Sequence, residues 1–248
     1  MSICCARQPT HESSDAPVAD ELKPHQISAF AAALRALGID AVDGYEATLR
    51  SNAREQATLD DFAREGLGAA TLRKAGLAVT MRDAPDLGVS HGAVRFHVEV
   101  ARFRRRPKDD VDDKSLRGYA ETGLLVDYGD PAGCATQVMR KLVEKAGKFP
   151  ADRPGVVAIH TDSTHQIEQL EVSMAMSAFN SDLCSGAIPV GPFAGVLCLG
   201  GGPPLDGPRR WGNVAFYPAS AAGPTLAAET ASLLANIAYR ITLDDLLH

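Results

Sequence analysis

Hydrophobic and polar residues alternate most regularly between Val94 and Phe103. The two faces of an extended chain would carry different residues there: Val94, Phe96, Val98 and Val100 on one, and Arg95, His97, Glu99 and Ala101 on the other. A period of two is typical of a strand with one buried face. We therefore expect a strand over Val94–Phe103, with its apolar face against a core and Glu99 on the opposite, solvated face.

Other segments also have the composition and length of strands. Two continuous apolar runs, Gly155–Thr161 and Phe193–Leu199, are typical of strands that are buried on both faces. Shorter strands are expected at Leu77–Arg82, at Leu87–Val89 and, as an edge strand, at Val214–Tyr217.

Between the expected strands, apolar residues recur at helical spacing. The predicted helices are Pro24–Leu37, ended by Gly38; Tyr45–Arg54; Leu59–Ala75, with Thr58 as N-cap; Leu116–Val126, as a short helix or an irregular crossing; Ala132–Lys148; Thr164–Phe179; and Leu226–Leu247. The expected buried stripe of Ala132–Lys148 consists of Cys134, Val138, Leu142 and Ala146.

Strands that alternate with helices after an initial strand meander predict an α/β fold. The expected architecture is a mixed central sheet of about five strands flanked by helices. Residues 1–24 are polar and predicted to be a disordered tail, residues 25–58 a helical appendage, and residues 59–248 one α/β domain with a C-terminal helix.

Composition narrows the classes of function. The formal net charge of −6 argues against indiscriminate binding of nucleic acid, which depends on neutralised phosphates. The five cysteines include no CxxC pair, so neither a disulfide framework nor a zinc site is indicated. No stretch reaches the apolar length of a membrane span, and the first residues lack the pattern of a secretory signal. We expect a cytoplasmic protein with no membrane partner.

Two acidic residues mark a candidate metal site. Asp86 follows Pro85 at the turn before the alternating strand, and Glu99 lies within that strand. Mg²⁺ takes oxygen ligands and needs only one or two carboxylates besides waters and a substrate phosphate. Convergence of Asp86 and Glu99 would meet that need. The alternative is structural, with Asp86 capping the turn after Pro85 and Glu99 on a wet sheet face.

Pro85-Asp86, a short linker and Glu99-Val100-Ala101 on an apolar strand resemble the restriction-endonuclease-like, or PD-(D/E)XK, superfamily. The resemblance covers the element order from Leu59 to Gly202. It implies a restriction-endonuclease-like core, Asp86 and Glu99 as Mg²⁺ ligands, and hydrolysis of phosphodiester bonds in DNA or RNA. In some of these nucleases a helix glutamate approaches the metal site, which makes Glu65 a candidate. The alternative for Glu65 is a solvated helix residue.

The lysine of the superfamily pattern is missing, because its position holds Ala101. A lysine there would orient water or stabilise developing negative charge. Arg102 is a poor replacement, since strand alternation directs it to the opposite face. The cationic and amide candidates on the helix Ala132–Lys148 are Gln137, Arg140 and Lys141. Gln137 and Lys141 share a helix face, although both could equally be ordinary exposed residues.

Two other polar clusters have simpler structural explanations. The basic run Arg102, Arg104, Arg105, Arg106 and Lys108 could contact phosphates, but the four aspartates between 109 and 113 would cancel much of its field, which favours a solvated loop. The run HxDxxH, comprising His160, Asp162, Ser163 and His165, follows a buried strand, where α/β sheets often present ligand residues. Its spacing matches no well-attested metal motif, which favours Asp162 as a helix cap.

The sequence therefore leaves two functions open. The first is a metal-dependent nuclease with Asp86 and Glu99 as Mg²⁺ ligands, completed by Glu65, Gln137 or Lys141. The second is a catalytically inactive copy of the same fold that serves as a binding or scaffold module, with a protein partner or a second copy of itself. Ala101 favours the second function, and the presence of both acids favours the first.

Overall fold

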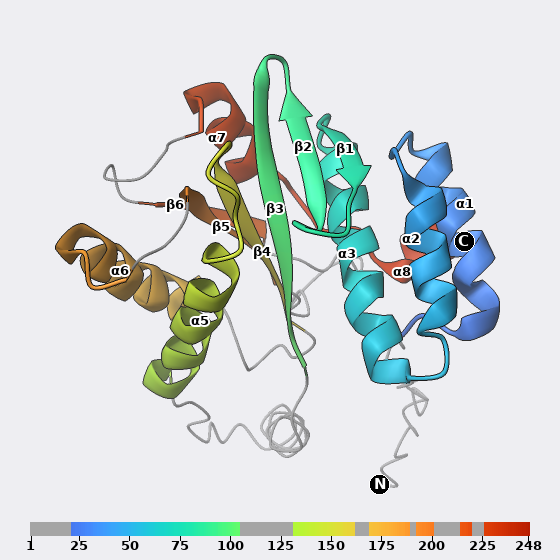
Figure 1. Cartoon of the computed structure of the whole chain (residues 1–248), viewed down its shortest axis with the longest axis horizontal. Helices are drawn as coiled ribbons and strands as arrows, with labels where there is room; N and C mark the ends of the chain where they lie inside the picture. Colours follow the sequence, from blue (N-terminus) through green and yellow to red (C-terminus); the bar gives the residue numbers. More distant parts are fainter. Residues whose placement is uncertain (1–20, 105–130, 162–168, 189–191, 201–213, 220–225) are drawn as a thin grey trace, which may run out of the picture.

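The chain forms three layers, with helices on both faces of a central sheet (Figure 1). The computed structural model describes residues 21–104, 131–161, 169–188, 192–200, 214–219 and 226–248. The expected tail, apart from its last residues, and the expected helix at Leu116–Val126 lie outside these ranges. In the described ranges, every helix is too short or too polar to cross a lipid bilayer.

In the described ranges, six strands build the sheet, in the same order as in the sequence. They are β1 (Ala78–Met81), β2 (Leu87–His91), β3 (Val94–Phe103), β4 (Gly155–Thr161), β5 (Phe193–Leu199) and β6 (Val214–Pro218). Strands β1 to β3 form an antiparallel meander, β3 to β5 are parallel, and β6 is antiparallel to β5 at the far edge. The predicted mixed α/β sheet is confirmed, with six strands rather than about five.

Helices α5 (Pro131–Ala146) and α6 (Gln169–Ser185) cover one face of the sheet. The predicted stripe of α5 is buried, and three of its residues, Val138, Leu142 and Ala146, pack against β3, β4 and β5 in one hydrophobic cluster. Every residue of β4 and β5 is buried, as the continuous apolar runs predicted.

The remaining helices belong to the opposite face. They are α1 (Ile27–Ala36), which follows the short 3₁₀ helix η1 (Pro24–Gln26), α2 (Val42–Ser51), α3 (Gln56–Lys74), α7 (Ala228–Ala235) and α8 (Leu243–Leu247). Apolar residues of the N-terminal helices, such as Phe30 and Leu49, belong to the same hydrophobic cluster as Val98 and Val100 of β3. The N-terminal helices and the sheet therefore share one core.

Helix α3 begins earlier than the sequence indicated. Its N-cap is Glu55, and Thr58 lies inside the first turn, so the prediction of Thr58 as N-cap is wrong. The Gln56 side chain donates hydrogen bonds to the Leu22 carbonyl oxygen, at 2.9 Å, and to Asp60 Oδ1, at 2.7 Å. These bonds fasten the first turn to the segment before η1 and make the earlier start favourable.

The prediction of one helix over Leu226–Leu247 is also wrong. Helix α7 ends at Ala235, and α8 begins only after Thr242. Between them, the backbone N–H of Ile241 donates to Thr71 Oγ1 of α3 at 2.9 Å. Thr242 then starts α8 through a reciprocal capping box with Asp245. A long-range hydrogen bond and a local cap together interrupt the helical pattern.

Candidate functional site

The site begins where the pairing between β2 and β3 stops. The first residue of β2, Leu87, lies opposite Val98 of β3. Asp86 immediately precedes β2, and its Oδ2 accepts a hydrogen bond from the backbone N–H of Val100 at 2.7 Å. The half-buried carboxylate of Asp86 therefore lies beside the part of β3 that contains Glu99.

Glu99 lies on a buried face of β3, not on the solvated face that the alternation suggested. It is 2% exposed, and Ala101 on the same face is 1% exposed. The alternation correctly assigned residues to the two faces of β3, but α5 covers the face that carries Glu99 and Ala101. Ala101 and Phe103 pack with α5 in its hydrophobic cluster, which explains why this face is dry.

A lysine reaches both acids from α5. Lys145 Nζ lies 2.9 Å from Glu99 Oε2 and 3.8 Å from Asp86 Oδ2. The side chains of Lys145 and Asp86 are only 13% and 14% exposed, so the three charges meet in a largely buried space. Burial lowers the pKa of Lys145. The charges of Asp86 and Glu99 and the hydrogen bond to Glu99 have a larger, opposite effect, so the pKa of Lys145 lies above its usual value. The ammonium group is therefore charged at neutral pH.

Lys145 was not among the residues predicted from the sequence. Its position could have been inferred only from the strand order, because α5 leads into β4, and β4 begins at Gly155 opposite His97 of β3. The last turn of α5 is thereby brought to the level of His97 and Glu99. Once β4 is known to pair with β3, a lysine in that turn becomes the natural partner for Glu99.

Glu65 approaches the same acids from α3. Burial and the negative charge of Asp86 raise the pKa of Glu65 to about 9, with a further contribution from Glu99 and an opposing one from Lys145. Burial and Glu99 also raise the pKa of Asp86, against the effect of Lys145. The solvated alternative for Glu65 is thus not what the structure shows, because it is half-buried and in electrostatic contact with the other acids.

Tyr45 of α2 fixes the turn of α3 that carries Glu65. Its hydroxyl donates to the carbonyl oxygen of Phe62 at 2.6 Å and accepts from the backbone N–H of Gly66 at 3.1 Å. A Cβ atom at Gly66 would lie 2.6 Å from Phe30 Cζ and 2.7 Å from Tyr45 Oη. The close approach of these two rings therefore requires glycine directly after Glu65.

The other predicted helix candidates lie elsewhere. Lys141 pairs with Glu144 at 2.9 Å on the surface of α5, one turn before Lys145. Gln137 is half-buried two turns from Lys145, and Arg140 is exposed. In the described ranges, neither Gln137 nor Lys141 forms a hydrogen bond or ion pair with Asp86 or Glu99. The lysine that pairs with Glu99, Lys145, lies on the helix predicted to carry a cation but at a position that was not predicted.

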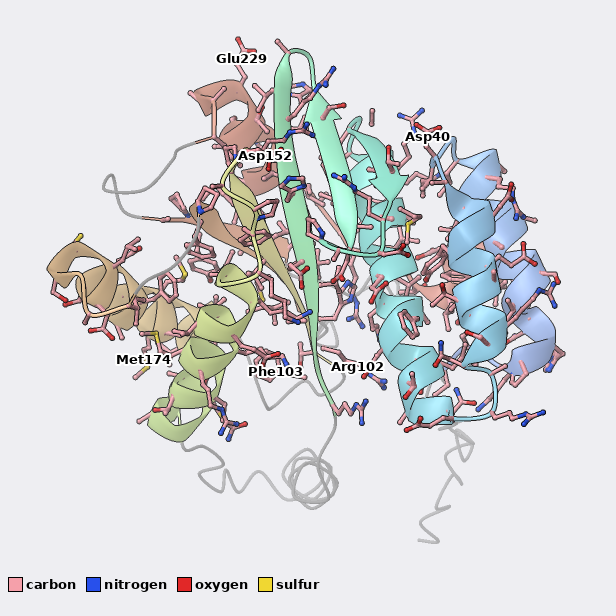
Figure 2. All side chains as sticks on the ribbon, in the orientation of Figure 1. Asp40, Arg102, Phe103, Asp152, Met174 and Glu229 are labelled. Atoms are coloured by element: carbon pink, nitrogen blue, oxygen red, sulfur yellow. The ribbon has the colours of Figure 1, made fainter. Side chains whose placement is uncertain are left out.

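Arg102 and Arg104 at the end of β3 contact α3. Arg102 Nη1 lies 3.2 Å from Asp61 Oδ1, and Arg104 also pairs with Asp61. Figure 2 shows Arg102 extending toward α3 and Phe103 toward α5, as strand alternation predicted. Arg105, Arg106, Lys108, Asp162, Ser163 and His165 lie outside the described residues, whereas His160 is buried in β4.

Asp86 and Glu99 are the two oxygen donors available to a divalent cation. Glu65 adds no negative charge near neutral pH, because its pKa of about 9 keeps it protonated. In the described part of the chain, no group of three or more His, Cys, Asp or Glu side chains is arranged to hold a metal ion. Two carboxylates suffice for Mg²⁺ when waters and a phosphate complete the shell.

Comparisons of this chain with known protein families, with curated proteins and with solved structures find no match.

Proposed function

We propose that this chain is a metal-dependent nuclease with a restriction-endonuclease-like core. In this proposal, Lys145 of α5 replaces the lysine of the superfamily pattern, whose position in β3 holds Ala101. The observation that supports this proposal is the position of Lys145 Nζ, 2.9 Å from Glu99 and 3.8 Å from Asp86. The main argument for an inactive copy was the missing lysine. A buried ammonium group beside both acids removes that argument.

Asp86 and Glu99 are the residues that would hold the metal, with Glu65 as a third acid nearby. A Mg²⁺ or Mn²⁺ ion bound there would polarise a phosphate group and lower the pKa of a bound water. Glu65 can donate a proton, because its raised pKa of about 9 keeps it protonated near neutral pH. The substrate class that follows from these groups is a phosphodiester of DNA or RNA.

Lys145 has donors available for the substrate. An ammonium group carries three N–H donors, and Glu99 accepts one of them at 2.9 Å. The others can donate to Asp86 and to a phosphate oxygen that enters the site. Fixed donors directed at developing negative charge can lower an activation barrier by several kcal/mol, about 2.7–4 for a single donor.

The test is cleavage by purified full-length protein of labelled single- and double-stranded DNA and RNA, with Mg²⁺ or Mn²⁺ and with a chelator. We expect cleavage that requires the metal and that falls at least a hundredfold in Glu99→Gln and Asp86→Asn. Glu144→Gln is the matched control, because Glu144 is an exposed acid on α5 and pairs with Lys141. No cleavage of any of the four substrates by the wild type would contradict the proposal.

One observation favours the second candidate, a catalytically inactive protein of the same fold that binds or scaffolds a partner. The Lys145 ammonium already bridges Glu99 and Asp86, and so acts as a built-in counter-ion where a metal would bind. The two candidates differ in metal binding. Titration of the wild type with Mn²⁺, followed by electron paramagnetic resonance, should detect a site that Glu99→Gln weakens if the nuclease proposal holds, and no such site in the inactive alternative.

A further inference from the structure

A second polar cluster lies at the carboxyl ends of the parallel strands, on the α3 side of the sheet. Arg102 of β3 and His160 of β4 are direct neighbours in the parallel register. Helix α3 lies over His160, since a Cβ atom at Gly68 of this helix would be 3.5 Å from His160 Nε2. Arg64 lies one turn before Gly68 on α3 and is 3% exposed.

A third arginine joins from the C-terminal segment. Arg240 Nη1 donates to the carbonyl oxygens of Thr161 and Leu199, at 3.3 and 3.4 Å. These carbonyls are at the ends of β4 and β5. Three arginines, from α3, β3 and the segment before α8, therefore act electrostatically on one histidine.

The side chain of His160 is fully buried, and within the described residues neither Nδ1 nor Nε2 has a hydrogen-bond partner. A buried polar group without a partner destabilises the folded state. Burial lowers the pKa of His160 well below its usual value, and Arg240, Arg64 and Arg102 lower it further. The neutral ring thus has one N–H donor and one acceptor to satisfy in a positive field.

The acids that face the cluster come from α3. Asp61 pairs with Arg102 and Arg104, and Asp60 Oδ2 lies 3.7 Å from Arg102 Nη1. Asp61 is therefore on the Arg102 side of the cluster, whereas Asp60 interacts electrostatically with both Arg102 and Arg64. The three arginines still act together to lower the pKa of His160, so the potential at the ring remains positive.

We propose that Arg64, Arg102, His160 and Arg240 bind a phosphate group, either free phosphate or the end of a phosphate monoester. Guanidinium groups present paired N–H donors that match phosphate oxygens, and the imidazole N–H adds another donor. The carboxyl ends of parallel strands are where α/β sheets usually bind ligands. Arg102 keeps 12% of its side chain exposed and Arg240 is half-buried, so two of the three arginines are partly accessible to solvent.

This proposal does not rest on the proposed nuclease activity, although Arg64 of the cluster directly precedes Glu65 of the candidate metal site on α3. The phosphate site lies on the α3 side of the sheet, whereas Glu99 and Lys145 meet on the α5 side. It also requires no metal. Its test is therefore carried out on the full chain in the presence of a chelator, and its outcome does not depend on whether the protein cleaves nucleic acid.

The experiment is calorimetric titration with inorganic phosphate and, separately, with phenyl phosphate, at constant ionic strength set by chloride. We expect saturable binding of at least one of them, weakened at least tenfold in Arg102→Gln. Arg104→Gln is the matched control, because Arg104 also pairs with Asp61 but lies two residues after Arg102, just past the end of β3, and is 52% exposed. Its affinity should stay within twofold of the wild type.

Binding of both compounds would identify a phosphate monoester as the ligand class, and binding of inorganic phosphate alone would identify free phosphate. A second readout uses only the wild type, so it does not depend on a variant that folds. The ring nitrogens of His160 should shift in ¹⁵N NMR spectra as phosphate is added. Absence of saturable binding, equal effects of Arg102→Gln and Arg104→Gln, or unchanged His160 resonances would each overturn the proposal.

Discussion

Lys145, Glu99 and Asp86 depend on one another, because each is largely buried and charged. Glu99 is 2% exposed, and its nearest cation is Lys145 at 2.9 Å. Taking a charge out of water costs several kcal/mol, and the interaction with its partner offsets that cost. Removal of one partner leaves the other charge buried without compensation.

We therefore expect Lys145→Met to lower the free energy of unfolding by about 3–5 kcal/mol. The double variant Lys145→Met/Glu99→Gln should recover much of this loss, because it removes the uncompensated carboxylate. Lys141→Met, which disrupts only the surface pair with Glu144, should change stability by less than about 1 kcal/mol. Urea denaturation of the three variants at neutral pH measures these differences.

The raised pKa of Glu65 predicts a pH dependence of stability. An unfolded chain releases the Glu65 proton near pH 4.5, whereas the folded chain keeps it up to about pH 9. Between these values the folded state binds more protons, so the contribution of Glu65 to stability is present at low pH and is lost as the pH rises. Glu65→Gln does not titrate. The stability of this variant relative to the wild type should therefore increase from pH 4.5 to 9 and then level off. Denaturation at a series of pH values measures this. A difference in unfolding free energy that does not change with pH would show that Glu65 is solvated.

Gly66 allows the contact between α3 and the rings of Phe30 and Tyr45. A Cβ atom there would be 2.6 Å from Phe30 Cζ, so Gly66→Ala should destabilise the protein by about 1–3 kcal/mol. Gly44 on α2 is the control, because a Cβ atom there meets nothing within 4 Å. Gly44→Ala should be neutral or stabilising by about 0.5–1 kcal/mol. Thermal unfolding of both variants makes the comparison.

At the scale of elements, the strands could be predicted well because their signal is local. The bounds of Val94–Phe103, Gly155–Thr161 and Phe193–Leu199 agree with β3, β4 and β5. The prediction of a single C-terminal helix was wrong because the spacing of apolar residues there resembles that of a helix: Leu234, Ile237 and Ile241 are three or four residues apart. All three are buried, but Ile241 is held by a hydrogen bond to Thr71, 170 residues away in the chain.

This bond gives a prediction for the connection between α3 and the C-terminal segment. Thr71→Val would leave the buried N–H of Ile241 without its acceptor, which should destabilise the protein by about 1–3 kcal/mol. Thr48→Val removes a similar hydroxyl from the exposed side of α2, where it bonds only the carbonyl oxygen of Gly44. It should change stability by no more than about 0.5 kcal/mol. Equal effects in urea denaturation would show that the bond to Ile241 does not stabilise the break.

The candidate site could be predicted only in part, and for the same physical reason. Asp86 and Glu99 could be predicted because a turn and an alternating strand are visible in the sequence, and Glu65 because the resembled superfamily includes nucleases with a helix glutamate near the metal site. Lys145 was missed because its place depends on the pairing of β4 with β3, which brings the last turn of α5 beside Glu99. The burial of Glu99 follows from the same pairing.

At the scale of the whole molecule, the sheet separates two polar centres. Glu99 and Lys145 lie under α5, while His160 and its arginines lie under α3. Between them, β3 contributes Glu99 to one centre and Arg102 to the other, because successive residues of a strand point to opposite faces. The chain as a whole carries a net charge of −6. Attraction of nucleic acid would therefore depend on local cations and bound metal, not on the overall field.

The central claim is that Lys145 replaces the missing lysine at Ala101. The most direct test is the rate of Mn²⁺-dependent cleavage by the wild type, Lys145→Met and Lys141→Met, each expressed per folded molecule as determined by circular dichroism. The account predicts a loss of at least a hundredfold in Lys145→Met and a rate within twofold of the wild type in Lys141→Met. Cleavage by Lys145→Met at the wild-type rate, or by none of the three proteins, would contradict it.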